Sequence, residues 1–117
     1  MATDGRMDRL CRLAGLVEDV HLSRIAAIEA GRAQVRARIA DLTVRTPSGS
    51  AAGHLHDAEA EVRYRRWAAA RIAALGSELA ALDARHAEAA ADAARAVGRR
   101  AVLERLAAAQ ARPRDEG

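Results

Sequence analysis

Apolar side chains recur along most of this chain at alternating spacings of three and four residues, which places them on one face of an α-helix. Near the start, the stripe comprises Leu10, Leu13, Val17, Val20, Ile25, Ile28, Val35, Ile39 and Leu42, with one residue of slippage near Arg24. Later it comprises Leu55, Val62, Ala69, Ile72, Leu75, Leu79, Leu82, His86, Ala89, Ala93, Ala96 and Leu103. From Ile72 to Leu103 the alternation is unbroken, and such sustained heptad spacing is typical of helices that pair.

The pattern predicts a single elongated domain of two helices, over residues 7–43 and 54–110. Between them, Pro and Gly residues and two Ser residues mark a loop over 44–53. Pro113 ends the second helix, and we expect residues 1–6 and 111–117 to be disordered.

Folding back at the loop pairs the helices antiparallel. If the numbers of facing residues add to about 96, apolar residues face each other almost throughout, for example Val17 with Leu79, Ile25 with Ile72 and Val35 with Val62. The second helix then extends past the first, so that residues 95–106 form a C-terminal overhang that contributes little to stability. The expected fold is all-α, a long two-helix antiparallel coiled-coil hairpin with this overhang.

Composition supports helix without a globular core. Of 117 residues, 32 are Ala and 19 are Arg, and there is no Lys. Ala and Arg rank high in helix propensity, so little in the local sequence opposes long helices. The net charge of +3 is smaller than is usual for a protein that binds nucleic acid. We expect no signal peptide and no membrane span, because the longest apolar run near the start is only LAGLV (13–17).

Residues that could support catalysis or bind metal are sparse. Cys11 is the only cysteine, which excludes an internal disulfide, favours a reducing compartment and suggests a small buried side chain. His54, His56 and Asp57 form the only histidine cluster, and without further ligands a capping or solvated role is favoured over a metal site. His86 occupies a seam position, where a polar residue more often fixes register than binds a ligand. The chain is expected to be no enzyme and to need no cofactor.

Both aromatic residues of the chain lie in RYRRWAAAR (63–71). In the predicted register, Tyr64 packs above Gly31 and Trp67 lies about 100° away from the seam. Trp67 would then be exposed beside Arg63 and Arg71, a composition typical of partner-binding surfaces. The alternative is that Trp67 only stacks on its own Arg neighbours.

Three motifs make this chain similar to a known family. Residues 62–106 resemble the C-terminal half of the FliJ family, through Tyr64-Arg65-x-Trp67 followed by a long heptad run and through the ending RRAVLERL (99–106). The start, MDRLCRLAGLVED (7–19), resembles the Leu-rich helix that opens family members. The FliJ proteins are small coiled-coil proteins of the bacterial flagellar export apparatus.

The resemblance implies a non-enzymatic stalk and adaptor between the export ATPase ring, the cytoplasmic domain of the export gate and export chaperones. It implies a cytoplasmic protein, peripheral at the inner membrane, that is a monomer or a weak homo-oligomer and binds no nucleic acid. The expected partner-binding residues are Arg63, Tyr64, Trp67, Arg71, Arg95, Arg99, Arg100, Leu103 and Leu106.

Two other interpretations stay open. The chain could be an unrelated structural coiled coil that dimerises through Ala89, Ala93, Ala96 and Leu103. It could also be a basic hairpin that associates with nucleic acid through Arg95, Arg99, Arg100 and Arg105, in which case its affinity would fall steeply with salt.

Overall fold

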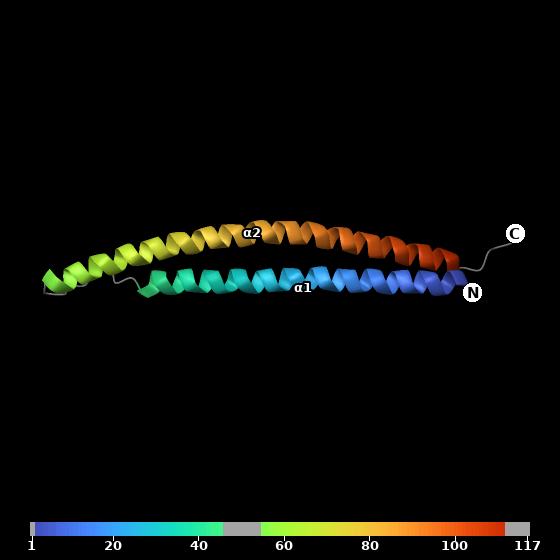
Figure 1. Cartoon of the computed structure of the whole chain (residues 1–117), viewed down its shortest axis with the longest axis horizontal. Helices are drawn as coiled ribbons and strands as arrows, with labels where there is room; N and C mark the ends of the chain where they lie inside the picture. The colour runs from blue at the N-terminus through green and yellow to red at the C-terminus, as the bar shows by residue number, and fades with distance from the viewer. Residues whose placement is uncertain (1, 46–54, 112–117) are drawn as a thin grey trace. The chain divides into compact units, whose positions relative to one another are not determined.

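The computed structural model describes residues 2–45 and 55–111, all of them helical. Helix α1 spans Ala2–Arg45 and helix α2 spans Leu55–Ala111 (Figure 1). Both helices agree with the prediction except at the start, where α1 begins at Ala2 and the expected disorder of residues 1–6 is therefore wrong from that residue on. Most of the predicted loop and nearly all of the predicted tail lie outside the described residues.

The chain divides into two compact units. The terminal unit pairs the first part of α1, up to Ala27, with the part of α2 from His86 onward. The middle unit pairs the rest of α1, from Ile28, with the part of α2 up to Arg85. In the terminal unit the two segments run antiparallel, because Glu18 contacts Arg100 whereas the later Arg24 contacts the earlier Asp92. The predicted all-α helical hairpin is confirmed.

The seam of α1 keeps a regular spacing of three and four over its described length. Its half-buried or buried positions in the terminal unit are Met7, Cys11, Ala14, Glu18, His21 and Ile25. In the middle unit they are Ile28, Arg32, Val35, Ile39 and Leu42. No slippage occurs at Arg24, so the prediction is right from Ile25 onward and wrong by one position before it.

The seam of α2 follows the predicted heptads from Ile72 onward. The inward positions there are Ile72, Leu75, Leu79, Leu82, His86, Ala89, Ala93, Ala96, Arg100, Leu103 and Ala107. Before Ile72 the covered positions include Tyr64 and Ala68, whereas the predicted Val62 and Ala69 are exposed. Ala89, Ala93 and Ala96 are buried within the terminal unit, so they cannot form the dimer surface considered above.

The predicted register between the helices is wrong. In the terminal unit, Arg24 contacts Asp92 and Glu18 contacts Arg100, and in the middle unit Gly31 faces Leu82. The numbers of these facing residues add to between 113 and 118, not to 96. Gly31 therefore lies beneath Leu82 and not beneath Tyr64, and Val17 shares a groove with Ala96 and Leu103 instead of meeting Leu79.

The expected C-terminal overhang is also wrong. Residues 95–106 pack on the N-terminal part of α1: Ala96 is buried, Leu103 is half-buried, and Arg100 reaches Glu18 across the seam. Their stabilising role follows from this packing, because removing them would expose the seam of α1 opposite.

Truncation after Ala94 should therefore destabilise the protein. We expect circular dichroism to show a loss of helix larger than the deleted residues themselves account for. The first turns of α1 would lose the segment on which they pack, and long helices depend on tertiary packing. A chain that ends at Ala111 keeps all the described helix and is the matched control. Unchanged melting of the shorter chain would contradict this register.

Leu75 should be the most sensitive single position of the middle unit. Its side chain is 1% exposed, and Leu75→Ala should lower the free energy of unfolding by about 2–4 kcal/mol, through lost burial and the cavity left behind. Leu16→Ala is the control, because Leu16 is 63% exposed and its truncation should lower the free energy of unfolding only slightly. Denaturant titration of both variants measures the difference.

Candidate partner-binding surfaces

The most prominent exposed feature of the terminal unit is an apolar stripe on α1. Leu10, Leu13, Val17 and Val20 are between 40% and 67% exposed. Each precedes a seam position by one residue and so lies about 100° from the seam around the helix. Arg6 and Arg24 continue the same spacing at its two ends. The stripe is therefore a second face of α1, separate from the one that packs on α2.

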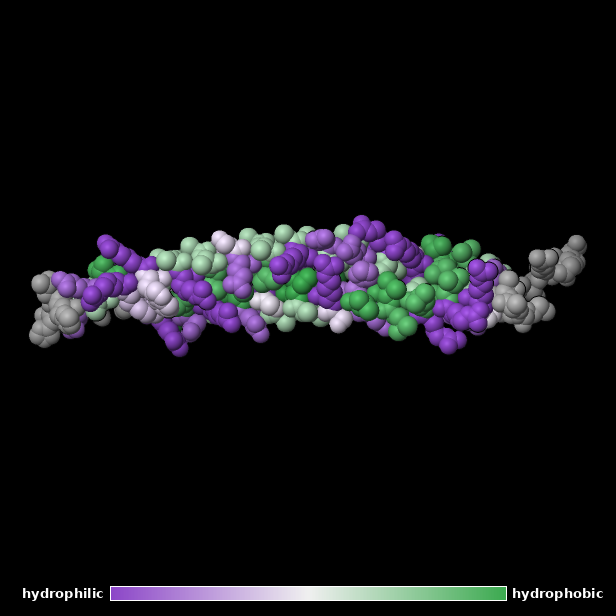
Figure 2. All heavy atoms as spheres, in the orientation of Figure 1, coloured by the Kyte–Doolittle hydropathy of each residue, from purple (hydrophilic) through white to green (hydrophobic). Residues whose placement is uncertain are grey.

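Side chains of α2 extend this stripe into a wider surface. One groove is lined by Leu10, Leu13, Ala14, Val17, Ala96, Arg99 and Leu103. An adjoining hollow is lined by Gly98, Arg99, Val102, Leu103 and Arg105. Leu106 is also about half exposed near this end of α2. Hydrophobic residues gather on this part of the surface in Figure 2. We call the surface formed by Leu10, Leu13, Val17, Val20, Val102, Leu103 and Leu106 the terminal apolar face.

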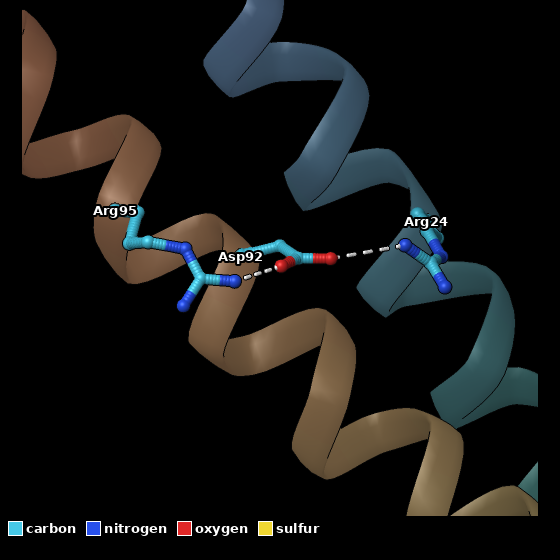
Figure 3. A network of polar contacts seen from close by, with 3 residues as sticks. All are labelled: Arg24, Asp92 and Arg95. Atoms are coloured by element: carbon cyan, nitrogen blue, oxygen red, sulfur yellow. Dashed lines mark hydrogen bonds and ion pairs between the residues drawn. The ribbon is translucent and has the colours of Figure 1, made fainter.

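A charged cluster closes the inner end of this face. Asp92 on α2 lies between Arg24 on α1 and Arg95 one turn further along α2 (Figure 3). Arg24 Nη1 donates to Asp92 Oδ2 over 3.4 Å, and Arg95 donates to the other oxygen. One carboxylate thus serves two guanidinium groups, which leaves the cluster with a net positive charge.

A second ion pair crosses the seam on the other side of the terminal unit. Arg100 Nη1 donates to Glu18 over 3.0 Å and its Nε donates to Glu104 over 3.0 Å. The hydrogen bond to Glu18, then that to Glu104, raises the pKa of Arg100. A raised pKa means that the stabilisation is complete below the ordinary value and is lost only in strong alkali. Arg100, predicted to bind a partner, is engaged within the chain.

The middle unit has a comparable cross-helix pair. Arg32 Nε lies 2.8 Å from an oxygen of Asp83, without the alignment of a hydrogen bond, so charge attraction holds the two groups. The Arg32 side chain is mostly covered, while Asp83 is about half exposed. Because the carboxylate of Asp83 is about half exposed to solvent, the pair fixes register more than it adds stability.

The two aromatic rings form one pair in the middle unit. The ring centroids of Tyr64 and Trp67 are 5.9 Å apart and their planes are tilted by 39°. Tyr64 is half-buried, whereas Trp67 is 56% exposed. Trp67 is therefore exposed as predicted, and its described ring contact is with Tyr64. Arg63 and Arg71 are exposed on the same stretch of helix.

The predicted site residues thus fall into two separate clusters. Four of them, Arg63, Tyr64, Trp67 and Arg71, belong to the middle unit, and Arg95, Arg99, Arg100, Leu103 and Leu106 belong to the terminal unit. The α1 side of the terminal apolar face was missed, because its Leu and Val residues were assigned to the seam. The slippage of one residue near Arg24 was the signal that could have revealed it. Such a slippage arises when a continuous helix carries two neighbouring apolar stripes, one facing its partner and one facing outward.

A cluster of side chains able to hold a metal ion does not form in the part of the chain that the structure describes. No three His, Cys, Asp or Glu side chains come together there. His54 and the side chain of His56 lie outside the described residues, Cys11 is half-buried in the seam, and so is His86. No described helix carries an apolar stretch sufficient to cross a bilayer.

Comparison with protein-family models, characterised proteins and solved structures found no match to this chain. Its function is therefore inferred from its residues and their arrangement.

Exchanging the charges of Arg24 and Asp92 should test the register directly. Arg24→Asp alone places two carboxylates together and should lower the free energy of unfolding by about 1 kcal/mol, a small value because both groups are partly exposed. Arg24→Asp with Asp92→Arg should recover most of this loss. The readout is a double-mutant cycle by denaturant titration, and strictly additive effects would contradict the contact.

Proposed function

We propose that the chain is a non-enzymatic coiled-coil component of the bacterial flagellar, or type III, protein export apparatus. It would act as a stalk and adaptor between the export ATPase ring, the export gate and export chaperones. The resemblance to the FliJ family motivates the proposal. The observation that carries it is the terminal unit, in which both terminal helix segments lie together and expose an apolar face.

The terminal unit suits entry into a ring of subunits. The inserted element would be a helix pair, held together by buried Ala89, Ala93 and Ala96 and by the Arg100–Glu18 contact. A pair resists bending better than a single helix and can present its apolar face without unfolding. Leu103, Leu106 and Arg99 would contact the ATPase from α2, and Leu10 and Leu13 would do so from α1.

The middle unit supplies a separate surface for a second partner. Trp67 exposes more than half of its surface, with Arg63 and Arg71 on the same helix. An exposed Trp beside Arg is the composition that binding hot spots favour. We assign this patch to the cytoplasmic domain of the export gate. The protein would then be cytoplasmic and peripheral at the inner membrane.

Binding to the export ATPase tests this function. Leu13→Ser with Leu106→Ser should weaken capture of the ATPase by at least about tenfold, because both side chains are exposed on the terminal apolar face and neither is needed for the seam. Leu22→Ser with Val44→Ser is the matched control, since both residues are exposed elsewhere on α1. Failure of the export ATPase to bind the wild-type chain would refute the proposal.

The aromatic patch should respond differently. Trp67→Ala should weaken binding of the gate domain by about thirtyfold, which corresponds to about 2 kcal/mol, while leaving ATPase binding intact. Its effect on folding should stay near 1 kcal/mol, the order of magnitude of an aromatic pair. Calorimetric titration with each partner and a thermal melt separate the two effects. A large fall in the melting temperature of the Trp67→Ala variant would show that Trp67 is needed for folding.

A further inference from the structure

We infer that the terminal apolar face binds an amphipathic helix of another protein whose apolar stripe is flanked by acidic residues. The inference deepens the proposed function, on which it rests for the identity of the partner, by stating the chemistry of the segment that binds. It is drawn from the spacing of the stripe, the groove beside it and the charges around it.

The spacing of the stripe matches a helix as the occupant. Leu10, Leu13, Val17 and Val20 follow intervals of three, four and three residues, the pattern of a coiled-coil seam. The groove between this stripe and Leu103 runs along two helices, so a third helix can insert its own apolar residues there. From residue 10 to residue 20 the stripe is about 15 Å long, which three turns of helix would cover.

The charges around the face are mainly basic. Arg6 and Arg24 end the stripe on α1, and Arg99 and Arg105 line the hollows on α2. The nearby acids are Asp92, which already accepts from Arg24 and Arg95, and Asp19, which lies at the outer edge beside Leu16 and Val20. A bound segment with acidic flanks would find complementary charge along α2 and at the two ends of the stripe on α1.

A second copy of this chain is a poorer occupant for the same reason. Two such faces would bring Arg residues together around the apolar centre, and like charges across an interface oppose association. The face supplies few carboxylates to balance them. Charge therefore distinguishes an acidic partner from self-association, although the apolar centre alone would suit either.

Two labelled peptides of about 21 residues test the inference. Both carry Leu at heptad a and d positions; one has Glu at all flanking positions and the other has Lys. We expect the full chain to bind the Glu peptide at least about tenfold more tightly than the Lys peptide by fluorescence anisotropy. This preference should shrink as salt rises from 50 to 300 mM, because salt screens exposed charges.

Charge reversal should invert the preference. Arg99→Glu with Arg105→Glu should weaken binding of the Glu peptide by at least about tenfold and improve binding of the Lys peptide. Arg36→Glu with Arg38→Glu makes the same change of net charge on exposed positions of the middle unit and should leave both affinities unchanged. Equal melting curves for the two double variants establish that each is folded.

Several results would overturn the inference. Equal affinity for the two peptides, or equal effects of the two double variants, would remove the role of charge. Binding to phosphatidylglycerol vesicles that depends on Arg99 and Arg105, without peptide binding, would assign the face to a membrane surface. Concentration-dependent dimerisation in sedimentation runs that Leu13→Ser abolishes would assign it to a second copy.

The two proposals can fail separately. If the Glu peptide binds with the expected preference and the export ATPase does not bind, the docking chemistry stands and the proposed function fails. If the ATPase binds and Arg99→Glu with Arg105→Glu has no effect on it or on the Glu peptide, the proposed function stands and the docking chemistry fails.

Discussion

Ion pairs across the seam fix the register of the terminal unit, on which the position of its apolar face depends. The seam of the terminal unit is rich in small residues, and Ala89, Ala93 and Ala96 each bury little surface. Small side chains let two helices approach closely, but they distinguish poorly between registers that differ by a heptad. Glu18 with Arg100, and Arg24 with Asp92, remove this ambiguity, because a shifted register would separate each carboxylate from its partner. The half-buried Glu18, only 15% exposed in its side chain, would lose most by such a shift.

The position of the seam on α1 also explains why large apolar residues of this helix remain exposed to solvent. A continuous α-helix turns by about 100° per residue, so it cannot change from the stripe of Leu13 and Val17 to that of Ile25 and Ile28 without a locally wider turn that accommodates one extra residue. Helix α1 keeps the stripe that includes Ile25 and extends it backward through His21 and Glu18. Polar side chains occupy inward positions as a result, and leucines and valines cover a neighbouring face. Had that second face held polar residues, the terminal unit would have offered no apolar docking surface.

The sequence was sufficient for much of the fold but not for its register. The 3-4 spacing predicted both helices and the seam of α2 from Ile72, because periodicity is local. Register is a long-range property, and matching apolar residues alone allowed Val17 to face Leu79 as readily as any other apolar position. Weighing Glu18 against Arg100 would have been needed to choose correctly. For the candidate sites, the exposure of Trp67 followed from its angle to the seam. The α1 side of the terminal apolar face could not be predicted in this way. A stripe of Leu residues is assigned to the core unless the register of the partner helix is known.

The confinement of both aromatic rings to the middle unit gives the molecule a built-in optical asymmetry. With one Tyr, one Trp and no Phe, intrinsic fluorescence arises wholly from the Tyr64–Trp67 pair, while far-ultraviolet dichroism reports helix in both units. The two signals coincide during heating only if the units unfold together. A fluorescence transition that precedes or follows the dichroism transition would reveal the order in which the two units open, without any label or added chromophore.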